Sequence, residues 1–416
     1  MIRGWHHLVR MPGRPFRLAG RLFGLARRGH RTASRQRLGL VADLPEQPYW
    51  FHAEQVGDLG LVEPVIRALR EAERGATFLV TTGDPAAVAR AEALFEDEEE
   101  GAAVLAPDDD PGPVRRFLRR ADPLAALFAG LPDRPELLFA AADAGLAPLI
   151  VDPGDPPPGR RRALRAALGE SGGVWVADTE TAEAFAELAP AGEARVIGDL
   201  RLDAPPPTAQ QIQKAEELRE TWGPARPVWL ALATEPGEEQ AVFEVFQGLR
   251  GRWHNLLLAL APRDPGRAGE AIAPALDAGY RVYHRSRGGE PRIDTDVYLE
   301  DRPHDWPLAC HTADLVFIGG TLHHGGNNPA PAAAAGRALL SGRSLDAIMP
   351  AAAALHDAGA LLVVGGRDYL EEGATTLLAD KERRHTMGEA ARAIAAPHAG
   401  AIAAVVDTLR ATADGR

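Results

Sequence analysis

The feature that most constrains the fold of this chain is a regular alternation of short apolar runs with helical patterns. Between the first two runs, apolar residues follow the i, i+3, i+4 spacing of an amphipathic helix, namely Leu61, Val62, Val65, Ile66 and Leu69. Strands that alternate with helices predict a parallel, doubly wound α/β sheet. The runs with the length of buried strands are Tyr49–Ala53, Thr77–Thr81, Ala103–Ala106, Leu124–Phe128, Pro148–Val151, Gly173–Ala177 and Ala194–Ile197.

The same alternation starts again after a stiff, proline-rich boundary at Ala204–Thr208. We therefore expect two Rossmann-like domains that face a cleft, because ligands of open α/β sheets bind beyond the carboxyl ends of the strands. The second set of strand-like runs is Val228–Ala233, Leu256–Leu260, Arg281–His284, Val297–Leu299, Leu315–Ile318, Ala338–Ser341 and Ala360–Val364.

The chain is thus predicted to have four parts. The segment Lys381–Arg410 has a continuous helical pattern, which predicts a terminal helix that packs back on the first domain. The predicted parts are a basic arm (residues 1–40), a first domain (41–205), a second domain (206–390) and the C-terminal helix (391–416).

Charge is divided unevenly along the chain. The formal net charge is −12, yet residues 1–40 contain ten arginines and no Asp, Glu or Lys. The acidic remainder argues against nucleic-acid binding, because a nucleic-acid backbone repels it. In the arm, apolar residues such as Trp5, Phe16 and Phe23 lie among the arginines, which predicts contact with an anionic membrane surface. The alternative is a solvated terminus.

Signals for a membrane span or a bound cofactor are absent from the sequence. No apolar run approaches the roughly 18 residues that a transmembrane helix needs. The single cysteine, Cys310, excludes an intramolecular disulfide and a thiolate cluster, and its apolar neighbours predict a buried helical residue. Gly57–Gly60 has only part of the dinucleotide-binding fingerprint, and no P-loop or nucleophile elbow is present. We therefore expect no cofactor.

The first polar loop, Phe51–Gly60, lies between the first predicted strand and the first long helix. Asp58 is at or near the start of that helix, where a carboxylate commonly caps backbone amides. The alternative is a general base for a substrate hydroxyl, which requires burial to offset the helix dipole. Glu54 is a further polar group of the loop. His52 alternates with apolar neighbours, which predicts a hydrogen-bonded core residue.

A glycine-rich loop, Gly319–Pro329, follows the predicted strand Leu315–Ile318 and precedes an alanine-rich helix. Such a loop can present free backbone N–H groups to an anion, which predicts phosphate binding. Tight turns alone are the alternative explanation of its glycines. His323 and His324 have no evident third ligand, so no metal site is expected.

A third loop, Ala261–Arg267, also follows an apolar strand. Arg263 or Arg267 could contact a phosphate there. The alternative is an ordinary turn in which Asp264 and Arg267 are solvated.

Taken in order, these loops resemble the motifs of the 3-deoxy-D-manno-octulosonic acid (Kdo) transferases over nearly the whole chain. Phe51–Asp58 is similar to the family's W-I-H-A-V-S-V-G-E, and Gly319–Pro329 is similar to G-G-S-L-x-x-x-G-G-H-N-P. Further similar segments are Arg35–Gly39 (R-E-R-L-G), Thr81–Pro85 (T-T-x-T-P), Val114–Leu118 (a helix in the family), Gly198–Asp203 (G-N-L-K-F-D) and Pro262–Arg267 (P-R-H-P-E-R).

The resemblance implies a GT-B glycosyltransferase at the cytoplasmic face of the inner membrane, which moves Kdo from CMP-Kdo to a lipid A precursor in lipopolysaccharide synthesis. Asp58 would take the proton of the acceptor hydroxyl as the anomeric carbon inverts. CMP would be held by amides and arginine, without an obligatory metal. The implied donor-side residues are Arg263, Gly319, Gly320, Thr321, Gly325, Gly326, Asn327 and Asn328, and the implied acceptor-side residues are His52, Glu54, Gln55, Gly57 and Thr82.

The chain departs from the family pattern at positions of chemistry. Gly130–Glu136 stands where the family has E-T-E-L-W-P-N, so both glutamates of that motif are lost. Asp152–Pro156 replaces N-A-R-L-S, Ala233–Glu235 replaces S-T-H, and Asn328–Ala332 replaces N-P-L-E-P. Asp58 replaces a glutamate and is one methylene shorter. Three hypotheses follow: a Kdo transferase, a non-catalytic binding protein on the same scaffold at the membrane, and a transferase with another nucleotide-sugar donor.

Overall fold

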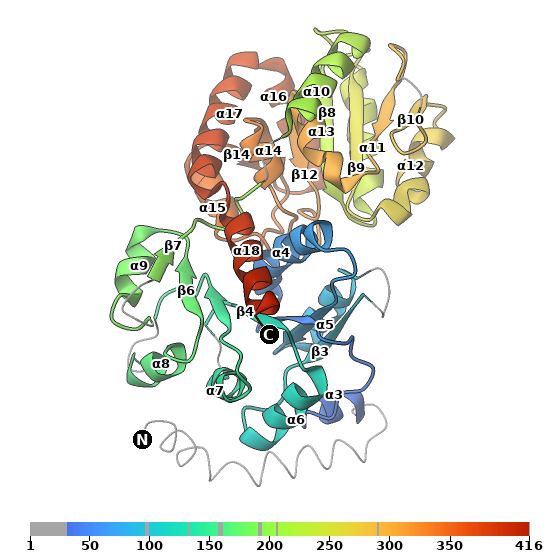
Figure 1. Cartoon of the computed structure of the whole chain (residues 1–416). Helices are drawn as coiled ribbons and strands as arrows, with labels where there is room; N and C mark the ends of the chain where they lie inside the picture. The colour runs from blue at the N-terminus through green and yellow to red at the C-terminus, as the bar shows by residue number, and fades with distance from the viewer. Residues whose placement is uncertain are drawn as a thin grey trace. The chain divides into compact units, whose positions relative to one another are not determined.

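The chain folds into two compact α/β units (Figure 1). The structure is a computed structural model that describes residues 31–95, 100–131, 134–156, 161–189, 194–204, 207–288 and 291–415. The first unit runs up to Leu200 and includes the helix that begins at Ala401, and the second unit is Arg201–Gly400. The boundary between the two units therefore lies at Leu200–Arg201. It precedes the proline-rich segment at which the sequence predicts the boundary.

The first unit is built on a seven-stranded parallel sheet in the order β3-β2-β1-β4-β5-β6-β7. All seven strands predicted for this part of the chain are present, with ends that differ by at most two residues. The bounds are β1 Tyr49–Ala53, β2 Phe78–Thr82, β3 Gly101–Leu105, β4 Ala125–Ala129, β5 Leu149–Val151, β6 Gly173–Val176 and β7 Ala194–Val196.

Helices cover both faces of this sheet because its strands are apolar on both sides. On β1, Tyr49 and Phe51 pack on the face covered by α4, α5 and α18, and Trp50 packs on the face covered by α6, α7, α8 and α9. The helices are α3 Arg31–Arg37, α4 Leu59–Ala72, α5 Pro85–Glu92, α6 Pro111–Ala121, α7 Pro135–Asp143, α8 Arg161–Leu168, α9 Thr179–Phe185 and α18 Ala401–Asp414.

The second unit repeats this plan with a parallel sheet in the order β10-β11-β9-β8-β12-β13-β14. Its seven predicted strands are also confirmed. The bounds are β8 Val228–Thr234, β9 Leu257–Pro262, β10 Val282–His284, β11 Val297–Leu299, β12 Leu315–Ile318, β13 Ala338–Ser341 and β14 Leu361–Val363.

Two apolar cores flank the second sheet. On β8, Leu230 packs towards α10, α13, α14, α15 and α17, while Trp229 packs towards α11, α12 and α16. Cys310 is fully buried in the first of these cores, as predicted, and burial raises the pKa of its thiol to about 12. The helices are α10 Ala209–Trp222, α11 Glu238–Arg250, α12 Ala268–Asp277, α13 Trp306–Thr312, α14 Ala330–Ala334, α15 Ala351–Asp357, α16 Arg367–Ala379 and α17 Lys381–Ala395.

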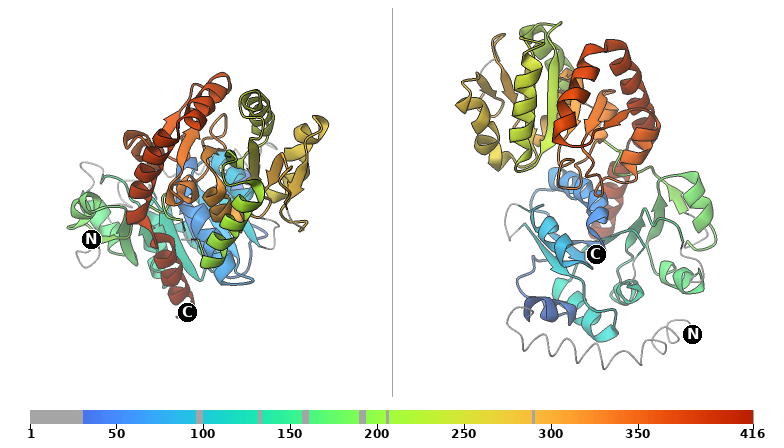
Figure 2. Two further views of the ribbon diagram at one scale, coloured as in Figure 1. Left: turned by 90° about the horizontal axis from the view of Figure 1, so that it is seen from above. Right: turned by 180° about the vertical axis from the view of Figure 1, so that it is seen from behind.

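The prediction of a single helix over Lys381–Arg410 is wrong, because the segment forms two helices. Helix α17 ends at Ala395, and a short 3₁₀ turn, Ala396–His398, contains Pro397, which cannot continue an α-helical ladder. Gly400 then adopts a left-handed φ of 90° before α18 begins. Helix α18 packs on α4 within the first unit, whereas the residues up to Gly400 belong to the second (Figures 1 and 2).

The predicted boundary of the N-terminal arm at residue 40 is wrong, because residues 31–40 pack on the first unit. The Arg37 guanidinium is buried and donates to the carbonyl oxygens of Gly83 and Ala106, at the ends of β2 and β3. Gln36 accepts a hydrogen bond from the Leu105 amide at 3.1 Å. The segment therefore ties two loops at the carboxyl edge of the sheet. Residues 1–30 lie outside the described part of the chain, in which no helix is long and apolar enough to cross a membrane.

Replacement of Arg37 by Ala is expected to lower the free energy of unfolding by about 2 kcal/mol, because two carbonyl groups lose their charged donor. Urea denaturation followed by circular dichroism measures the effect. Arg35→Ala is the matched control, since Arg35 lies on the same helix and is exposed. Equal stability of the two variants would contradict the structural role of Arg37.

Candidate functional site

The carboxyl edge of the first sheet gathers most of the predicted acceptor-side residues. Strand β1 lies between β2 and β4, with Ala53 opposite both Thr82 and Ala129. The loops that follow these three strands therefore meet beyond the same edge. They carry Glu54, Asp58 and Arg134.

Glu54 forms a bidentate ion pair with Arg134, which lies just before α7. Arg134 Nε and Nη2 each lie 3.0 Å from a carboxylate oxygen of Glu54, and Arg134 Nη1 donates to the carbonyl of Pro107 at 3.2 Å. Burial raises the pKa of Glu54, but the hydrogen bonds and charges of His52 and Arg134 outweigh burial and lower it from 4.5 to about 2. Glu54 is thus an ionised carboxylate that is a weak proton acceptor.

His52 is a buried, hydrogen-bonded residue of β1, as predicted. Its Nδ1 lies 3.0 Å from Thr81 Oγ1, and its Nε2 lies 3.2 Å from Glu54 Oε2. Only 1% of His52 is exposed. The imidazole therefore contacts the Glu54 carboxylate from within the core and is not accessible to a substrate.

Asp58 ends a 3₁₀ turn, Val56–Asp58, that leads directly into α4. Its Oδ2 accepts a hydrogen bond from the Gln55 amide at 2.9 Å, whereas no side-chain cap hydrogen bond is made to α4. The capping role predicted for Asp58 therefore applies to the 3₁₀ turn rather than to the long helix. The Asp58 side chain is half-buried, and Gln55 is exposed. A Cβ added to Gly130, after β4, would lie 3.7 Å from Asp58 Oδ1, so Gly130 borders the carboxylate.

The remaining acceptor-side residues shape this edge. Thr82 is fully buried, and its hydroxyl donates to the carbonyl of Asp84 at 2.9 Å. At Gly83 an added Cβ would lie 1.9 Å from Glu54 Oε1, so glycine is needed for the approach of the carboxylate. Gly57 lies within the 3₁₀ turn. Thr82 and Gly57 therefore support the loop conformation.

In the second unit, the glycine-rich loop after β12 is organised by a buried carboxylate, Glu238. Glu238 lies at the start of α11 and accepts hydrogen bonds from the amides of Gly320 at 2.6 Å, Leu322 at 3.0 Å and Glu235 at 3.0 Å. Burial raises the pKa of Glu238, and these amides oppose the shift. The carboxylate therefore occupies donors that the sequence assigned to a phosphate.

Other groups of this loop are engaged in the same way. The amides of Gly319, His324, Gly325, Gly326 and Asn327 donate to acceptors within the unit. Thr321 links the carbonyl of Ile318 to the amide of Gly342, and Asn327 donates to the carbonyl of Ala233 at 2.7 Å. Asn328 accepts from the amide of Ala330. The expectation of a loop with free N–H groups is therefore wrong for most of its length, because internal acceptors are already in place.

Arg263, the predicted phosphate ligand, lies at the end of β9 and pairs with Glu235 at 3.2 Å. Arg267 pairs with Glu239 at 3.2 Å and is only 15% exposed, so the alternative of a solvated Arg267 is also wrong. Asp264 accepts from the amide of Gly266 and starts a short 3₁₀ turn. Each arginine of this edge thus faces a glutamate.

Arg134 and three glutamates after β8 were not predicted as site residues from the sequence. The glutamates are Glu235, Glu238 and Glu239. The signal for the glutamates was present, because the acidic segment E-P-G-E-E follows a strongly apolar strand and must lie at its carboxyl end. Arg134 offered no local signal, since its partner Glu54 is 80 residues away. Within the described ranges, no group of three or more His, Cys, Asp or Glu could hold a metal ion.

Comparison with known proteins identifies the family. The model of the 3-deoxy-D-manno-octulosonic-acid transferase (kdotransferase) family matches residues 32–204. The chain is 34% identical to the 3-deoxy-D-manno-octulosonic acid transferase of Bordetella pertussis, over 93% of this chain and 91% of that protein. This chain belongs to the Kdo transferase family. The protein of the same name from Haemophilus influenzae is 25% identical, over 88% of this chain and 87% of that protein.

As a member of the Kdo transferase family, the chain is a glycosyltransferase, and its two parallel α/β units are the Rossmann-like domains of the GT-B fold. Among solved structures, the C-terminal CMP-Kdo binding domain of WaaA from Acinetobacter baumannii is 22% identical and covers 45% of this chain and 98% of its own, with a TM-score of 0.43. MurG of the same organism is 14% identical and covers 88% and 100%, with a TM-score of 0.49.

The Glu54–Arg134 pair predicts a pH-dependent stability of this Kdo transferase family member. Because the folded-state pKa of Glu54, about 2, lies below its ordinary value of 4.5, the pair stabilises the fold above about pH 4.5 and loses this effect as the pH falls towards 2. We expect Glu54→Gln to lower the free energy of unfolding by about 2 kcal/mol at neutral pH. Urea denaturation at pH 7 and pH 3 should show a smaller difference from the parent at pH 3.

The control is Glu63→Gln, which removes a more exposed pair with Arg67 on α4. It is expected to cost less than about 0.5 kcal/mol. A cost of Glu54→Gln that is the same at both pH values would show that the ion pair does not contribute.

Proposed function

We propose that this chain transfers Kdo from CMP-Kdo to a lipid A precursor, with Asp58 as the general base, at the cytoplasmic face of the inner membrane. Membership of the Kdo transferase family carries the proposal. The second support is a half-buried carboxylate, Asp58, beside a glycine at the carboxyl edge of the first sheet.

Asp58 is a better candidate for the base than Glu54. The pKa of Glu54 is lowered to about 2 and both its oxygens face Arg134, so Glu54 is a poor proton acceptor near neutral pH. In the proposed step, the acceptor oxygen forms a bond to the anomeric carbon as the bond from that carbon to the CMP phosphate breaks. The acceptor proton passes to Asp58, and CMP leaves with the electron pair of the broken bond.

The donor phosphate is proposed to bind at the glycine-rich loop through the donors that remain. Among the described loop residues, the amides of Thr321, His323 and Asn328 donate no hydrogen bond within the unit. Arg263 would exchange Glu235 for the phosphate, and no metal or cofactor is required for this binding.

A non-catalytic binding protein is the second candidate, and the Glu235–Arg263 pair favours it. A carboxylate that already neutralises the expected phosphate ligand competes with an anionic donor. The two candidates differ in whether the second unit still binds a nucleotide. A transferase that uses another donor would bind a nucleotide other than CMP.

Calorimetric titration with CMP, UMP, ADP and UDP tests the proposed donor. We expect CMP-selective binding, and we expect Arg263→Gln to weaken it roughly tenfold through loss of a charged hydrogen bond. Arg383→Gln, an exposed arginine on α17, is the matched control. Selective binding of another nucleotide would show that the donor is not CMP-Kdo. If none of the nucleotides binds at millimolar concentration, the result would favour the non-catalytic binding protein.

The base is tested by Asp58→Asn in an assay with CMP-Kdo and lipid A precursor. We expect kcat to fall roughly 10²–10⁴-fold with little change in the KM of the donor, because the amide cannot accept the proton. Asp84→Asn is the control, since Asp84 is an exposed carboxylate that caps α5 near the same sheet edge and asparagine caps equally well. A kcat close to that of the parent would exclude Asp58 as the base.

The lipid acceptor is proposed to be reached through the N-terminal arm. Residues 1–30 contain seven arginines and no acidic residue, and basic segments with apolar residues bind anionic lipid surfaces. Deletion of residues 1–30 keeps the segment that Arg37 ties to the first unit. We expect this truncated chain to lose sedimentation with anionic vesicles, with neutral vesicles as the control. Unchanged sedimentation would contradict a role for the arm.

A further inference from the structure

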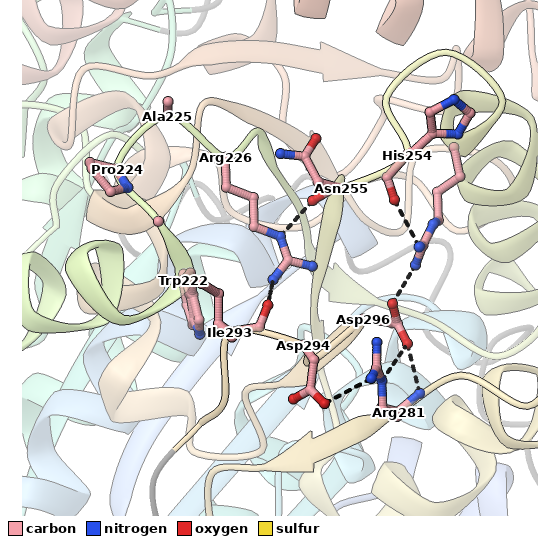
Figure 3. A pocket seen from close by; sticks show the side chains of 12 residues that line it. Trp222, Pro224, Ala225, Arg226, His254, Asn255, Arg281, Ile293, Asp294 and Asp296 are labelled. Carbon is pink, nitrogen blue, oxygen red and sulfur yellow. Dashed lines mark hydrogen bonds and ion pairs between the residues drawn. The ribbon is translucent and has the colours of Figure 1, made fainter.

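A pocket with three arginines lies at the amino-terminal edge of the second sheet (Figure 3). Its residues immediately precede four neighbouring strands: Arg226 before β8, Asn255 before β9, Arg281 before β10 and Asp296 before β11. The glycine-rich loop follows β12 and therefore lies at the opposite edge of the same sheet. The pocket is thus separate from the proposed donor site.

Arg226 is a buried cation that forms no ion pair within the described part of the chain. It is 7% exposed, and its guanidinium donates only to backbone carbonyls. The acceptors are Asn255 and Ile293, the latter at 2.8 Å (Figure 3), and Thr295 at 2.6 Å. Burial lowers the pKa of Arg226, and the charge of Asp296 opposes this shift. A buried charge without a paired counter-ion is costly, so the site favours an added anion.

The other charges of the pocket do not remove this imbalance. Asp296 binds both Arg250 and Arg281, and Asp294 lies 2.7 Å from Arg281 (Figure 3). Each carboxylate is hydrogen-bonded to other arginines, Asp296 to Arg250 and Arg281, and Asp294 to Arg281 and Arg292. Neither of them forms an ion pair with Arg226.

Trp222, at the end of α10, adds a buried polar group without a hydrogen-bond partner among the described residues. Its side chain is 1% exposed, and its Nε1 has no hydrogen-bond acceptor among the described residues. A buried indole N–H usually finds a partner. Trp222 lines the same pocket as Arg226.

The pocket is larger than a simple inorganic ion requires, and part of its border is apolar. The cavity measures about 510 Å³, which is in the range of small-molecule sites. Pro224, Ala225 and Ile293 form an apolar border, and Ile293 is 72% exposed. These residues could contact the carbon skeleton of a ligand.

We propose that this pocket binds a small organic oxyanion, a phosphate ester or a carboxylate, whose charged oxygens lie against Arg226 and Trp222. The site is independent of the proposed donor site, because the two occupy opposite edges of the sheet. A ligand held here does not take part in transfer and acts as an effector or a structural ligand.

Titration calorimetry of the full chain with inorganic phosphate, glycerol 3-phosphate and citrate tests the proposal, with neutral glycerol as the control. The three anions separate a phosphate requirement from a carboxylate requirement. We expect at least one anion to bind, and Arg281→Gln and Trp222→Phe each to raise its Kd roughly tenfold. Trp222→Phe keeps the aromatic packing and removes only the N–H donor.

Arg226→Gln should abolish binding of the anion. This result is informative only if the circular dichroism spectrum of the variant matches that of the parent. The Arg281 side chain is 61% exposed, so Arg281→Gln is expected to fold normally. It can therefore test the proposal even if Arg226→Gln fails to fold. Arg383→Gln and Arg263→Gln should leave the Kd unchanged. Absence of binding of all three anions at millimolar concentration, or binding that is insensitive to Trp222→Phe and Arg281→Gln, would overturn the proposal. Loss of binding in Arg263→Gln would assign the anion to the glycine-rich loop and would also overturn it.

Discussion

All strand pairings in the two sheets are parallel, and parallel pairing brings the carboxyl ends of distant strands to one edge. In the first unit this edge joins the loops after β1, β2 and β4, so that Glu54 meets Arg134 across 80 residues of sequence. In the second unit it joins the loops after β8, β9 and β12, where Glu238 meets the glycine-rich loop. The amino ends of β8 to β11 lie at the other edge, where the pocket that contains Arg226 is found.

Two carboxylates, the buried Glu238 and the half-buried Glu54, stabilise the carboxyl edges of the sheets. Glu238 receives three backbone amides, and Glu54 receives a bidentate arginine, so neither charge is buried without partners. The same contacts use donors that an anionic substrate would need, because each amide N–H donates once. The phosphate binding that we propose for the glycine-rich loop would therefore require an exchange, in which Arg263 leaves Glu235. The affinity for the proposed nucleotide would depend on the difference between these two pairings.

Much of the fold was predictable because each strand is a short apolar run buried on both faces, and such runs are visible locally in the sequence. The break between α17 and α18 was missed although Pro397 and Gly400 mark it, because the apolar spacing continues on both sides. The site was harder to predict. His52 was assigned to the core from its apolar neighbours, but the pairs Glu54–Arg134 and Glu235–Arg263 depend on which strands are adjacent. Strand order is a property of the sheet, which local patterns do not specify.

Some of the departures from the family motifs lie around Asp58. Glu54 and Arg134 stand where the motifs have Val and Trp, so two apolar residues are replaced by opposite charges that contact one another. Gly130 stands where the motif has Glu, and a Cβ there would lie 3.7 Å from Asp58 Oδ1. A glutamate at this position would bring a second carboxylate next to Asp58 and favour protonation of one of the two. With glycine at 130, that position adds no carboxylate beside Asp58, and Glu54 is held ionised by Arg134. The substitutions therefore place one carboxylate of this edge in an ion pair, which accords with the proposed role of Asp58 as the general base.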